Sequence, residues 1–159
     1  INKNKKVVLL GSGGAARAIA VESALKDIAE ITIINRTLEK AEEIVEIIKN
    51  NTKVVARAIK MQSVQNIPSC DLLINATSIG LASDSEMPNI NYDDISSDMM
   101  VQDVVINPVE TSFLRQAEQR GAAISTGLDM LVYQGKIGIR LWTGHEVDVD
   151  ILKGSLRNE

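Results

Sequence analysis

Glycines near the start of the chain have the spacing of a phosphate-binding turn. The segment Gly11-Ser12-Gly13-Gly14-Ala15 follows the apolar residues 7–10 and opens a helix-forming stretch. Gly11 would allow a tight turn, and Gly13 would let the backbone approach a pyrophosphate without a Cβ atom in the way. Free N–H groups at the helix start, with the positive end of its dipole, would then hold phosphate. Because a strand precedes and a helix follows, we favour a dinucleotide site over a glycine-rich turn that binds nothing.

Cations follow the second apolar run, at the place where such a fold chooses its nucleotide. The run ends in Asn35-Arg36-Thr37, and Lys40 follows one turn later. An acidic residue there would bond the ribose 2′-hydroxyl of NAD, whereas an arginine accommodates the 2′-phosphate of NADP. The alternative is a solvated Arg and Lys at a helix start, but cations there oppose the helix dipole. With no carboxylate at this position, the sequence predicts NADP.

Later turns should lie on the same edge of a sheet and form the floor of a cofactor cleft. Thr77, Ser78 and Ile79 follow one expected strand, Ile106 ends the next, and Gly127 follows the last. Gly127, Met130 and Gln134 are spaced by three and four residues, so a helix would place them on one stripe. Met130 would then line the cofactor cleft, and Gln134 could project toward a substrate. The alternative for Gln134 is an exposed helix residue with no ligand.

Short apolar runs alternate with amphipathic stretches along the whole chain. The runs predict strands at residues 5–10, 31–34, 53–58, 71–75, 100–106 and 122–125. The amphipathic stretches predict helices at residues 15–26, 38–49, 111–120, 128–142 and 147–157, with Thr37 capping the second. This order predicts a single α/β domain over residues 1–159. We expect a Rossmann-like, doubly wound, mostly parallel sheet with helices on both faces.

Composition excludes several classes of function. The net charge of −4, the pI near 5.1 and the aromatic content of 3% argue against a nucleic-acid partner or an acidic lipid surface. Cys70 is the single cysteine, which suits a reducing cytoplasm. No apolar run is long enough to cross a membrane, and no spacing of side chains suggests a metal site. The chain begins with Ile1, which suggests a fragment or a processed chain.

Taken together, the motifs resemble the C-terminal NADP-binding domain of shikimate dehydrogenases. The resemblance runs over essentially the whole chain, and its ordered motifs are specific where the glycine turn alone is not. These motifs are the glycine turn, Asn35-Arg36-Thr37, residues 75–80, residues 103–111 and residues 127–135.

The resemblance implies reversible reduction of 3-dehydroshikimate to shikimate with NADPH, a step of aromatic amino-acid biosynthesis. By this analogy residues 11–15 hold the pyrophosphate, and Asn35, Arg36 and Lys40 hold the 2′-phosphate. Residues 77–79, Val104 and Gly127 would line the nicotinamide, and Gln134 would bond a substrate hydroxyl.

Several positions depart from the family pattern. Ile106 stands where the family usually has a substrate-facing tyrosine, which leaves open whether shikimate, quinate or both are substrates. Thr126 and Asp129 replace the more usual Asp and Gly around Gly127, and Asp129 adds a negative charge near the cofactor.

The family's catalytic Lys–Asp pair belongs to an N-terminal domain that no part of this chain matches, so we assign no catalytic residue. We expect residues 128–159 to pack against that missing domain and to expose an apolar patch in its absence. The candidates are Leu141, Trp142, Val147, Val149, Ile151 and Leu152.

We therefore expect an NADP-binding half of an oxidoreductase that binds cofactor but has no turnover alone. One alternative is a stand-alone NADP-binding or sensing module without catalysis. Another is the nucleotide domain of glutamyl-tRNA reductase, which residues 75–80 and 127–135 fit poorly. A homodimer is compatible with the sequence, which leaves the oligomeric state open.

Overall fold

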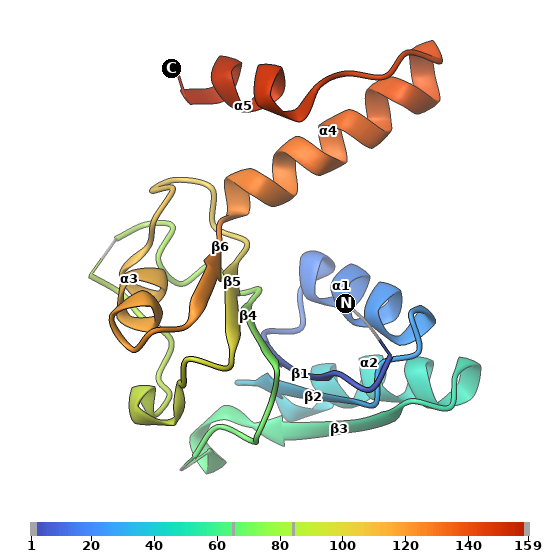
Figure 1. Ribbon diagram of the computed structural model, residues 1–159. Helices are drawn as coiled ribbons and strands as arrows, with labels where there is room; N and C mark the ends of the chain where they lie inside the picture. The colour runs from blue at the N-terminus through green and yellow to red at the C-terminus, as the bar shows by residue number, and fades with distance from the viewer. Residues whose placement is uncertain (1–2, 65, 84, 158–159) are drawn as a thin grey trace.

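A single parallel sheet organises the molecule (Figure 1). The structure is a computed structural model that describes residues 3–64, 66–83 and 85–157. Its six strands lie in the order β3-β2-β1-β4-β5-β6, and all neighbouring strands are parallel. The strands are β1 (Lys6–Leu10), β2 (Glu30–Asn35), β3 (Val55–Lys60), β4 (Leu72–Asn75), β5 (Met100–Asp103) and β6 (Ala123–Ser125). This order confirms the predicted doubly wound Rossmann-like fold, with a switch point between β1 and β4.

Helices cover both faces of the sheet because alternate strand residues point to opposite sides. Val7 and Leu9 of β1 face the first core, with α1 (Gly14–Leu25) and α2 (Leu38–Asn51) packed against it. Val8 and Leu10 face the second core, which α3 (Ser112–Gln119) covers with Phe113 and Leu114. Burial on both faces explains why these strands appear in the sequence as continuous apolar runs.

Several element boundaries differ from the sequence-based expectation. The fifth strand ends at Asp103 instead of Ile106. Thr37 does occupy the N-cap of α2, but its side chain accepts no hydrogen bond there. Two short 3₁₀ helices, η1 (Met61–Ser63) and η2 (Tyr92–Asp94), lie between the predicted elements. Gly121 adopts φ 84° directly after the cap of α3, a left-handed conformation that favours glycine at the end of a helix.

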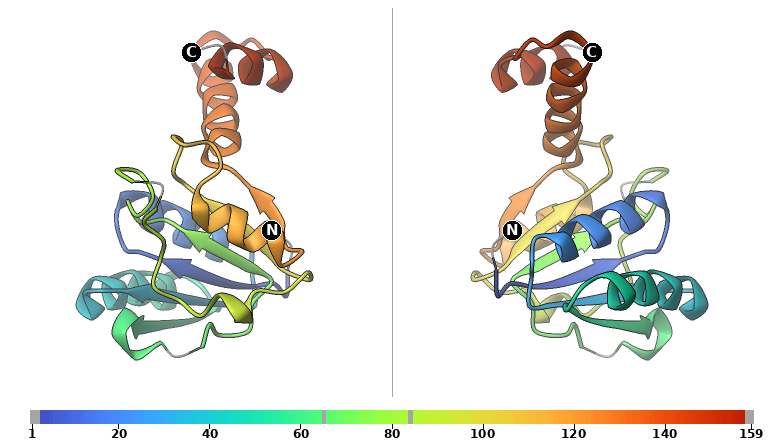
Figure 2. Two further views of the ribbon diagram at one scale, coloured as in Figure 1. Left: turned by 90° about the vertical axis from the view of Figure 1, so that its left-hand side faces the viewer. Right: turned by 90° about the vertical axis from the view of Figure 1, so that its right-hand side faces the viewer.

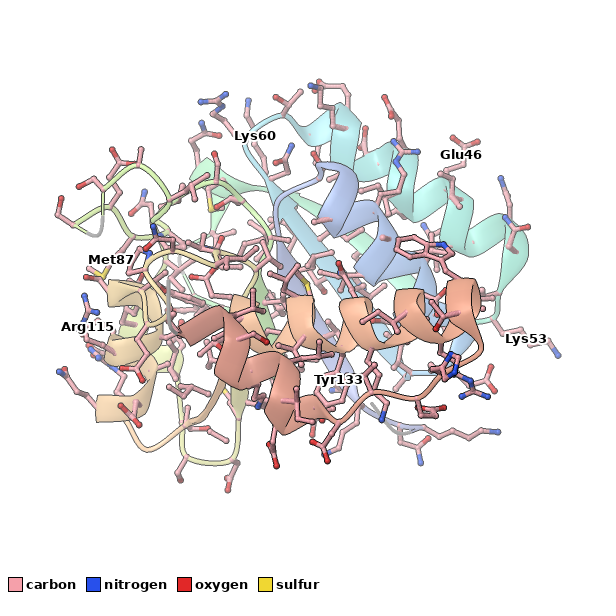
Figure 3. All side chains as sticks on the ribbon, turned by 90° about the horizontal axis from the view of Figure 1, so that it is seen from above. Glu46, Lys53, Lys60, Met87, Arg115 and Tyr133 are labelled. Carbon is pink, nitrogen blue, oxygen red and sulfur yellow. The ribbon has the colours of Figure 1, made fainter. Side chains whose placement is uncertain are left out.

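An arm of two helices projects from the sheet. The long helix α4 (Gly127–Thr143) leaves the end of β6 and carries the arm away from the sheet, as both views in Figure 2 show. Figure 1 shows α5 (Val149–Arg157) folding back along α4. Figure 3 looks down on this arm and labels Tyr133 on α4. Of the expected apolar patch, Trp142 is 86% exposed, Leu141 77% and Ile151 68%. Val147, Val149 and Leu152 are instead half-buried, whereas Tyr133 and Ile137 are exposed as well.

Within the described residues, no helix has the length and apolar character needed to cross a membrane.

Candidate functional site

The glycine turn between β1 and α1 has the backbone geometry that its sequence predicted. Gly11 adopts φ +105°, and a Cβ atom there would lie 2.8 Å from the carbonyl oxygen of Ala76. A Cβ atom on Gly13 or Gly14 would meet no atom within 4 Å, so open space faces both residues. Gly13 is the N-cap of α1, and no side chain caps the helix there. The first turn of α1 can therefore offer its N–H groups to an anion.

A cavity of about 390 Å³ joins this turn to the cations after β2. It is lined by residues 11–13, 35–37, Lys40 and 76–78. The side chain of Asn35 donates to the carbonyl oxygen of Thr37 at 2.7 Å and shapes this corner. Arg36 and Lys40 are exposed, and neither forms an ion pair within the part of the chain that the structure describes. Two uncompensated cations beside free helix N–H groups make a site for a ligand with several phosphates.

The turn after β4 is held in one conformation by its own side chains. Oδ1 of Asn75 accepts hydrogen bonds from the backbone N–H of Thr77 at 3.2 Å and from its hydroxyl at 2.6 Å. The Thr77 hydroxyl oxygen in turn accepts from the N–H of Ile79 at 3.1 Å. Ser78 and Ile79 also line a neighbouring cavity of about 330 Å³ that opens beside Arg36. Of the predicted residues 77–79, Thr77 and Ser78 therefore line both cavities, and Ile79 lines only the smaller one.

The turns after β5 and β6 are pressed against each other. A Cβ atom on Gly127 would lie 2.2 Å from the carbonyl oxygen of Val105 and 2.7 Å from that of Val104. Only glycine therefore allows α4 to begin this close to β5. Val104 is half-buried and packs against the first core, while Ile106 is 39% exposed.

Two predicted residues follow along α4. Met130 is half-buried and Gln134 is exposed. Val104, Ile106, Gly127, Met130 and Gln134 lie at the β5 and β6 end of the carboxyl edge, outside the cavity of about 390 Å³. Gly14 and Ala15 lie in the first turn of α1 and are exposed.

Asp103 is a buried carboxylate at the end of β5, and it was overlooked as a functional candidate. Oδ1 accepts from the Asn75 side chain and from the Val105 N–H, each at 3.0 Å, and Oδ2 accepts from the Thr111 hydroxyl at 2.7 Å. Burial raises the pKa of Asp103 above its ordinary value, and these hydrogen bonds oppose that rise. The sequence does contain an indication of this network: the polar residues Asn75, Asp103 and Thr111 stand directly beside apolar segments, where buried polar side chains need partners.

Asp129, which we expected to add a negative charge near the cofactor, is paired within the arm. Its carboxylate completes a capping box with Thr126 at the start of α4 and pairs with Lys153 of α5 at 2.6 Å. The pKa of Asp129 lies below its ordinary value, mainly because Lys153 donates to the ionised form. The charge is therefore compensated within the arm.

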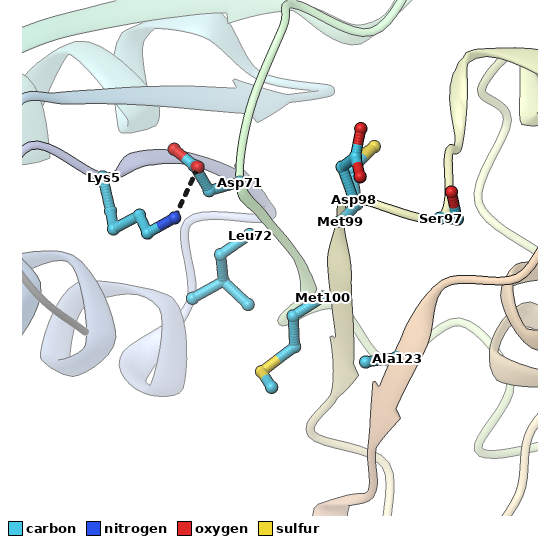
Figure 4. A pocket seen from close by; sticks show the side chains of 8 residues that line it. All are labelled: Lys5, Asp71, Leu72, Ser97, Asp98, Met99, Met100 and Ala123. Carbon is cyan, nitrogen blue, oxygen red and sulfur yellow. Dashed lines mark hydrogen bonds and ion pairs between the residues drawn. The ribbon is translucent and has the colours of Figure 1, made fainter.

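A second cavity, of about 400 Å³, lies at the opposite edge of the sheet (Figure 4). It is lined by residues at the amino ends of β1, β4, β5 and β6, among them Lys5, Asp71 and Met100. Its one lysine and Asp71 already satisfy each other at 2.8 Å. Open parallel sheets bind ligands at their carboxyl edge, so the first cavity is the candidate site.

Amide, hydroxyl and cationic side chains line the candidate site. The residues that line it include no carboxylate and no imidazole. His145 is exposed in the arm, where Nδ1 contacts the carbonyl oxygen of Thr143 at 2.9 Å. No group of three His, Cys, Asp or Glu side chains within the described ranges could hold a metal ion.

Comparison with known proteins agrees with this geometry. The family model described as Shikimate / quinate 5-dehydrogenase matches residues 2–103, which is more than half of the chain. This chain belongs to that family. A second model, described as Shikimate 5'-dehydrogenase C-terminal domain, matches residues 127–157. The two matches include both the cavity-lining residues and the helical arm.

Individual relatives are similar over one part of their length. A protein from Methanopyrus kandleri named shikimate dehydrogenase (NADP(+)) is 39% identical over 155 residues, which cover 95% of this chain and 53% of that protein. The ligand-free 5-ketofructose reductase of Gluconobacter sp. strain CHM43 is 42% identical with a TM-score of 0.95, covering 98% of this chain and 57% of that one. Shikimate 5-dehydrogenase from Listeria monocytogenes, in complex with shikimate and NAD, is 32% identical with a TM-score of 0.91 and the same coverage. The chain spans about half the length of the curated relatives it matches.

Proposed function

We propose that this chain is the NADP(H)-binding half of a shikimate dehydrogenase, an oxidoreductase that reversibly reduces 3-dehydroshikimate to shikimate. One observation carries the proposal. A single cavity joins an uncapped helix N-terminus to Arg36 and Lys40, with no carboxylate at the end of β2. This combination suits a dinucleotide with an additional phosphate on its ribose.

One group of residues fits the adenosine and phosphate half of the cofactor, and another fits the nicotinamide half. Residues 11–15 would hold the pyrophosphate, since the space that faces Gly13 and Gly14 is open. Asn35, Arg36, Thr37 and Lys40 would surround the 2′-phosphate of the adenosine. Residues 77–79, Val104, Gly127 and Met130 would lie along the nicotinamide, and Gln134 and Ile106 would face the substrate. When bound, NADPH supplies the hydride.

Turnover requires groups beyond this chain. Hydride transfer to a carbonyl needs a general acid at the carbonyl oxygen, and the two cations that line the cavity, Arg36 and Lys40, are assigned here to the adenosine 2′-phosphate. We propose that the remainder of the enzyme supplies it and packs against residues 128–159. The exposure of Tyr133, Ile137, Leu141 and Trp142 supports this arrangement, because monomeric proteins seldom leave so much apolar surface in water. The chain alone then binds NADP(H) without oxidising shikimate.

Calorimetric titration with NADP⁺ and NAD⁺ tests the proposal. We expect tighter binding of NADP⁺, and loss of that preference in Arg36→Ala, because the 2′-phosphate loses its bidentate partner. Arg57→Ala is the matched control: Arg57 is an exposed arginine on β3 that pairs with Glu30 at 3.3 Å and lies outside the cavity. Absence of binding by either nucleotide, or equal effects of the two variants, would contradict the proposal. An NADP-sensing module without catalysis becomes the better hypothesis if the full-length protein binds NADP⁺ but does not oxidise shikimate.

A second candidate substrate is a different hydroxy-ketone, such as 5-ketofructose. It is favoured by Ile106, which lacks the hydroxyl of the family's usual tyrosine, and by the 42% identity to the Gluconobacter reductase. The enzyme containing this chain should be assayed with shikimate, quinate and 5-ketofructose, beside Ile106→Tyr. Higher kcat/KM for 5-ketofructose, shifted toward shikimate by Ile106→Tyr, would favour this candidate.

Location and assembly complete the proposal. We infer a cytoplasmic enzyme, because NADPH-dependent biosynthesis and a lone free cysteine suit a reducing compartment. A homodimer remains an expectation that light scattering at several protein concentrations can measure.

A further inference from the structure

The side chain of Asp103 is fully buried, and both of its carboxylate oxygens accept hydrogen bonds. Its partners are the side chain of Asn75, the backbone N–H of Val105 and the hydroxyl of Thr111. All of these groups donate, so the pocket around the carboxylate suits an acceptor only. A buried carboxylate is costly to desolvate, and an apolar residue could end the strand at no such cost. The presence of Asp103 therefore calls for an explanation beyond packing.

The side-chain partners of Asp103 come from two connections at the carboxyl edge: Asn75 ends β4, and Thr111 caps α3. Asn75 uses its other bonds to fix the β4 turn, donating also to the carbonyl oxygen of Ile79 at 3.2 Å and accepting from Thr77. Thr111 passes the connection on to α3, because its hydroxyl oxygen accepts from the N–H of Leu114 at 3.3 Å. The carboxylate is the point at which these turns meet.

The bond to Val105 extends the same network to α4. Asp103 accepts from the N–H of Val105, and the same peptide carries the carbonyl oxygen of Val104, which a Cβ on Gly127 would approach to 2.7 Å. The first turn of α4, and with it the stripe of Met130 and Gln134, is thus seated on a peptide that Asp103 orients. A small shift of this peptide would move the floor of the β4–β6 half of the site.

The adenosine half of the site is held by other bonds. The N–H of Gly11 donates to the carbonyl oxygen of Ile34 at 2.8 Å, and the N–H of Ala76 donates to that of Leu10 at 2.9 Å. These backbone bonds connect β1, β2 and β4 without Asp103. The glycine turn and the cations of the adenosine half are therefore held independently of Asp103, and only residues 76–78 border both halves of the site.

We propose that Asp103 is a positioning residue that sets the nicotinamide floor of the site without touching the cofactor. The inference rests on the proposed function, since it needs a nicotinamide nucleotide in this cavity. Asp103 acts through the turn at residues 75–79 and through Val104 and Val105.

The test compares two ligands that share the adenosine half. NADPH occupies both halves, whereas adenosine 2′,5′-bisphosphate reaches only the phosphate and adenosine side. In Asp103→Asn one oxygen remains as an acceptor while the amide nitrogen faces the Thr111 hydroxyl. We expect NADPH binding, followed by nicotinamide fluorescence, to weaken about tenfold, as for a disrupted set of hydrogen bonds. Binding of the bisphosphate should change less than about twofold.

Two controls keep the test sharp. Ile48→Val removes one buried methyl group near the far end of α2 and should leave both affinities unchanged. If Asp103→Asn does not fold, Asn75→Ser breaks the next link and should give the same selective loss. Equal weakening of both ligands, or unchanged NADPH binding in a folded variant, would overturn the inference while leaving the proposed function intact. Failure of the unmodified chain to bind either ligand would overturn both.

Discussion

Nζ of Lys153 on α5 lies 2.6 Å from Oδ1 of Asp129 in the first turn of α4. The same carboxylate accepts from the backbone N–H of Thr126 at 3.3 Å and from its hydroxyl at 3.1 Å. Asp129 thus starts one helix and holds the other against it. The arm that we propose as the interdomain surface is organised around this residue.

The pair should make the arm sensitive to acid. The pKa of Asp129 is lowered in the folded chain, first by the hydrogen bond from Lys153. A carboxyl whose pKa is lowered on folding stabilises the fold above its unfolded pKa, and this stability is lost as the pH falls through the folded pKa. We therefore expect the arm to weaken below about pH 4. Because both side chains are about one third exposed, the effect should be about 0.5–1 kcal/mol.

Thermal unfolding at pH 7 and pH 3 measures this dependence. Asp129→Asn keeps an acceptor for Thr126 but removes the charge, so the difference between the two pH values should shrink. Asp150→Asn removes an exposed carboxylate of α5 that has no ion pair among the described residues, and it should leave the difference unchanged. Equal behaviour of the two variants would show that the pair does not hold the arm.

Gly127 should tolerate no side chain, whereas Gly135 on the same helix should. A Cβ atom on Gly127 would collide with the backbone of Val104 and Val105, which can give way only if the end of β5 moves. Gly127→Ala should cost about 1–3 kcal/mol in the free energy of unfolding. At Gly135 a Cβ atom meets nothing within 4 Å, so Gly135→Ala should stabilise by about 0.5–1 kcal/mol. Urea unfolding followed by circular dichroism measures both, and a neutral Gly127→Ala would contradict the packing.

Much of this architecture could be predicted from the sequence because its determinants are local. The strands of a parallel sheet are buried on both faces, so β1 and β2 appear as apolar runs. Gly11 adopts a positive φ that other residues rarely adopt, so a glycine in the sequence indicates where such a turn can occur. The cations Arg36 and Lys40 lie directly after the end of β2 in the chain. Each of these signals lies within a few residues of the feature it predicts.

The network around Asp103 could not be predicted because its partners are distant in the chain. Asn75 lies 28 residues before Asp103, and Thr111 lies 8 residues after it. The β-branched residues 104–106 continue the apolar pattern, so the strand was expected to run to Ile106. The carboxylate instead takes the N–H of Val105, and the strand ends at Asp103. The compensation of Asp129 by Lys153 was hidden for the same reason.

The glycines at positions 11 and 13 should fail in different ways. Gly11→Ala should destabilise the fold by about 1–3 kcal/mol, because φ is +105° and the carbonyl oxygen of Ala76 is 2.8 Å from the new atom. Gly13 has φ −74° and open space, so Gly13→Ala should cost less than about 1 kcal/mol.

The same pair separates folding from cofactor binding. In Gly13→Ala the new methyl group would enter the space proposed for the pyrophosphate, so NADP⁺ affinity should fall about tenfold or more. Melting temperature and calorimetric affinity should therefore move separately in this variant. Unchanged NADP⁺ binding by a folded Gly13→Ala would place the pyrophosphate elsewhere.

Cys70 should be an unreactive thiol in the folded chain. Burial, and then the neighbouring charge of Asp71, raise its pKa to about 12 against a backbone hydrogen bond that lowers it. Thiolate is the form that reacts with alkylating agents, so at pH 8 the reactive fraction should be more than about tenfold below that of a free cysteine. Iodoacetamide labelling followed by mass spectrometry measures the rate, with the chain unfolded in guanidinium as the reference. Because the raised pKa depends on burial, labelling should become fast only on unfolding. A native rate within tenfold of the unfolded rate would mean that the segment before β4 opens readily and that Cys70 spends much of its time in water.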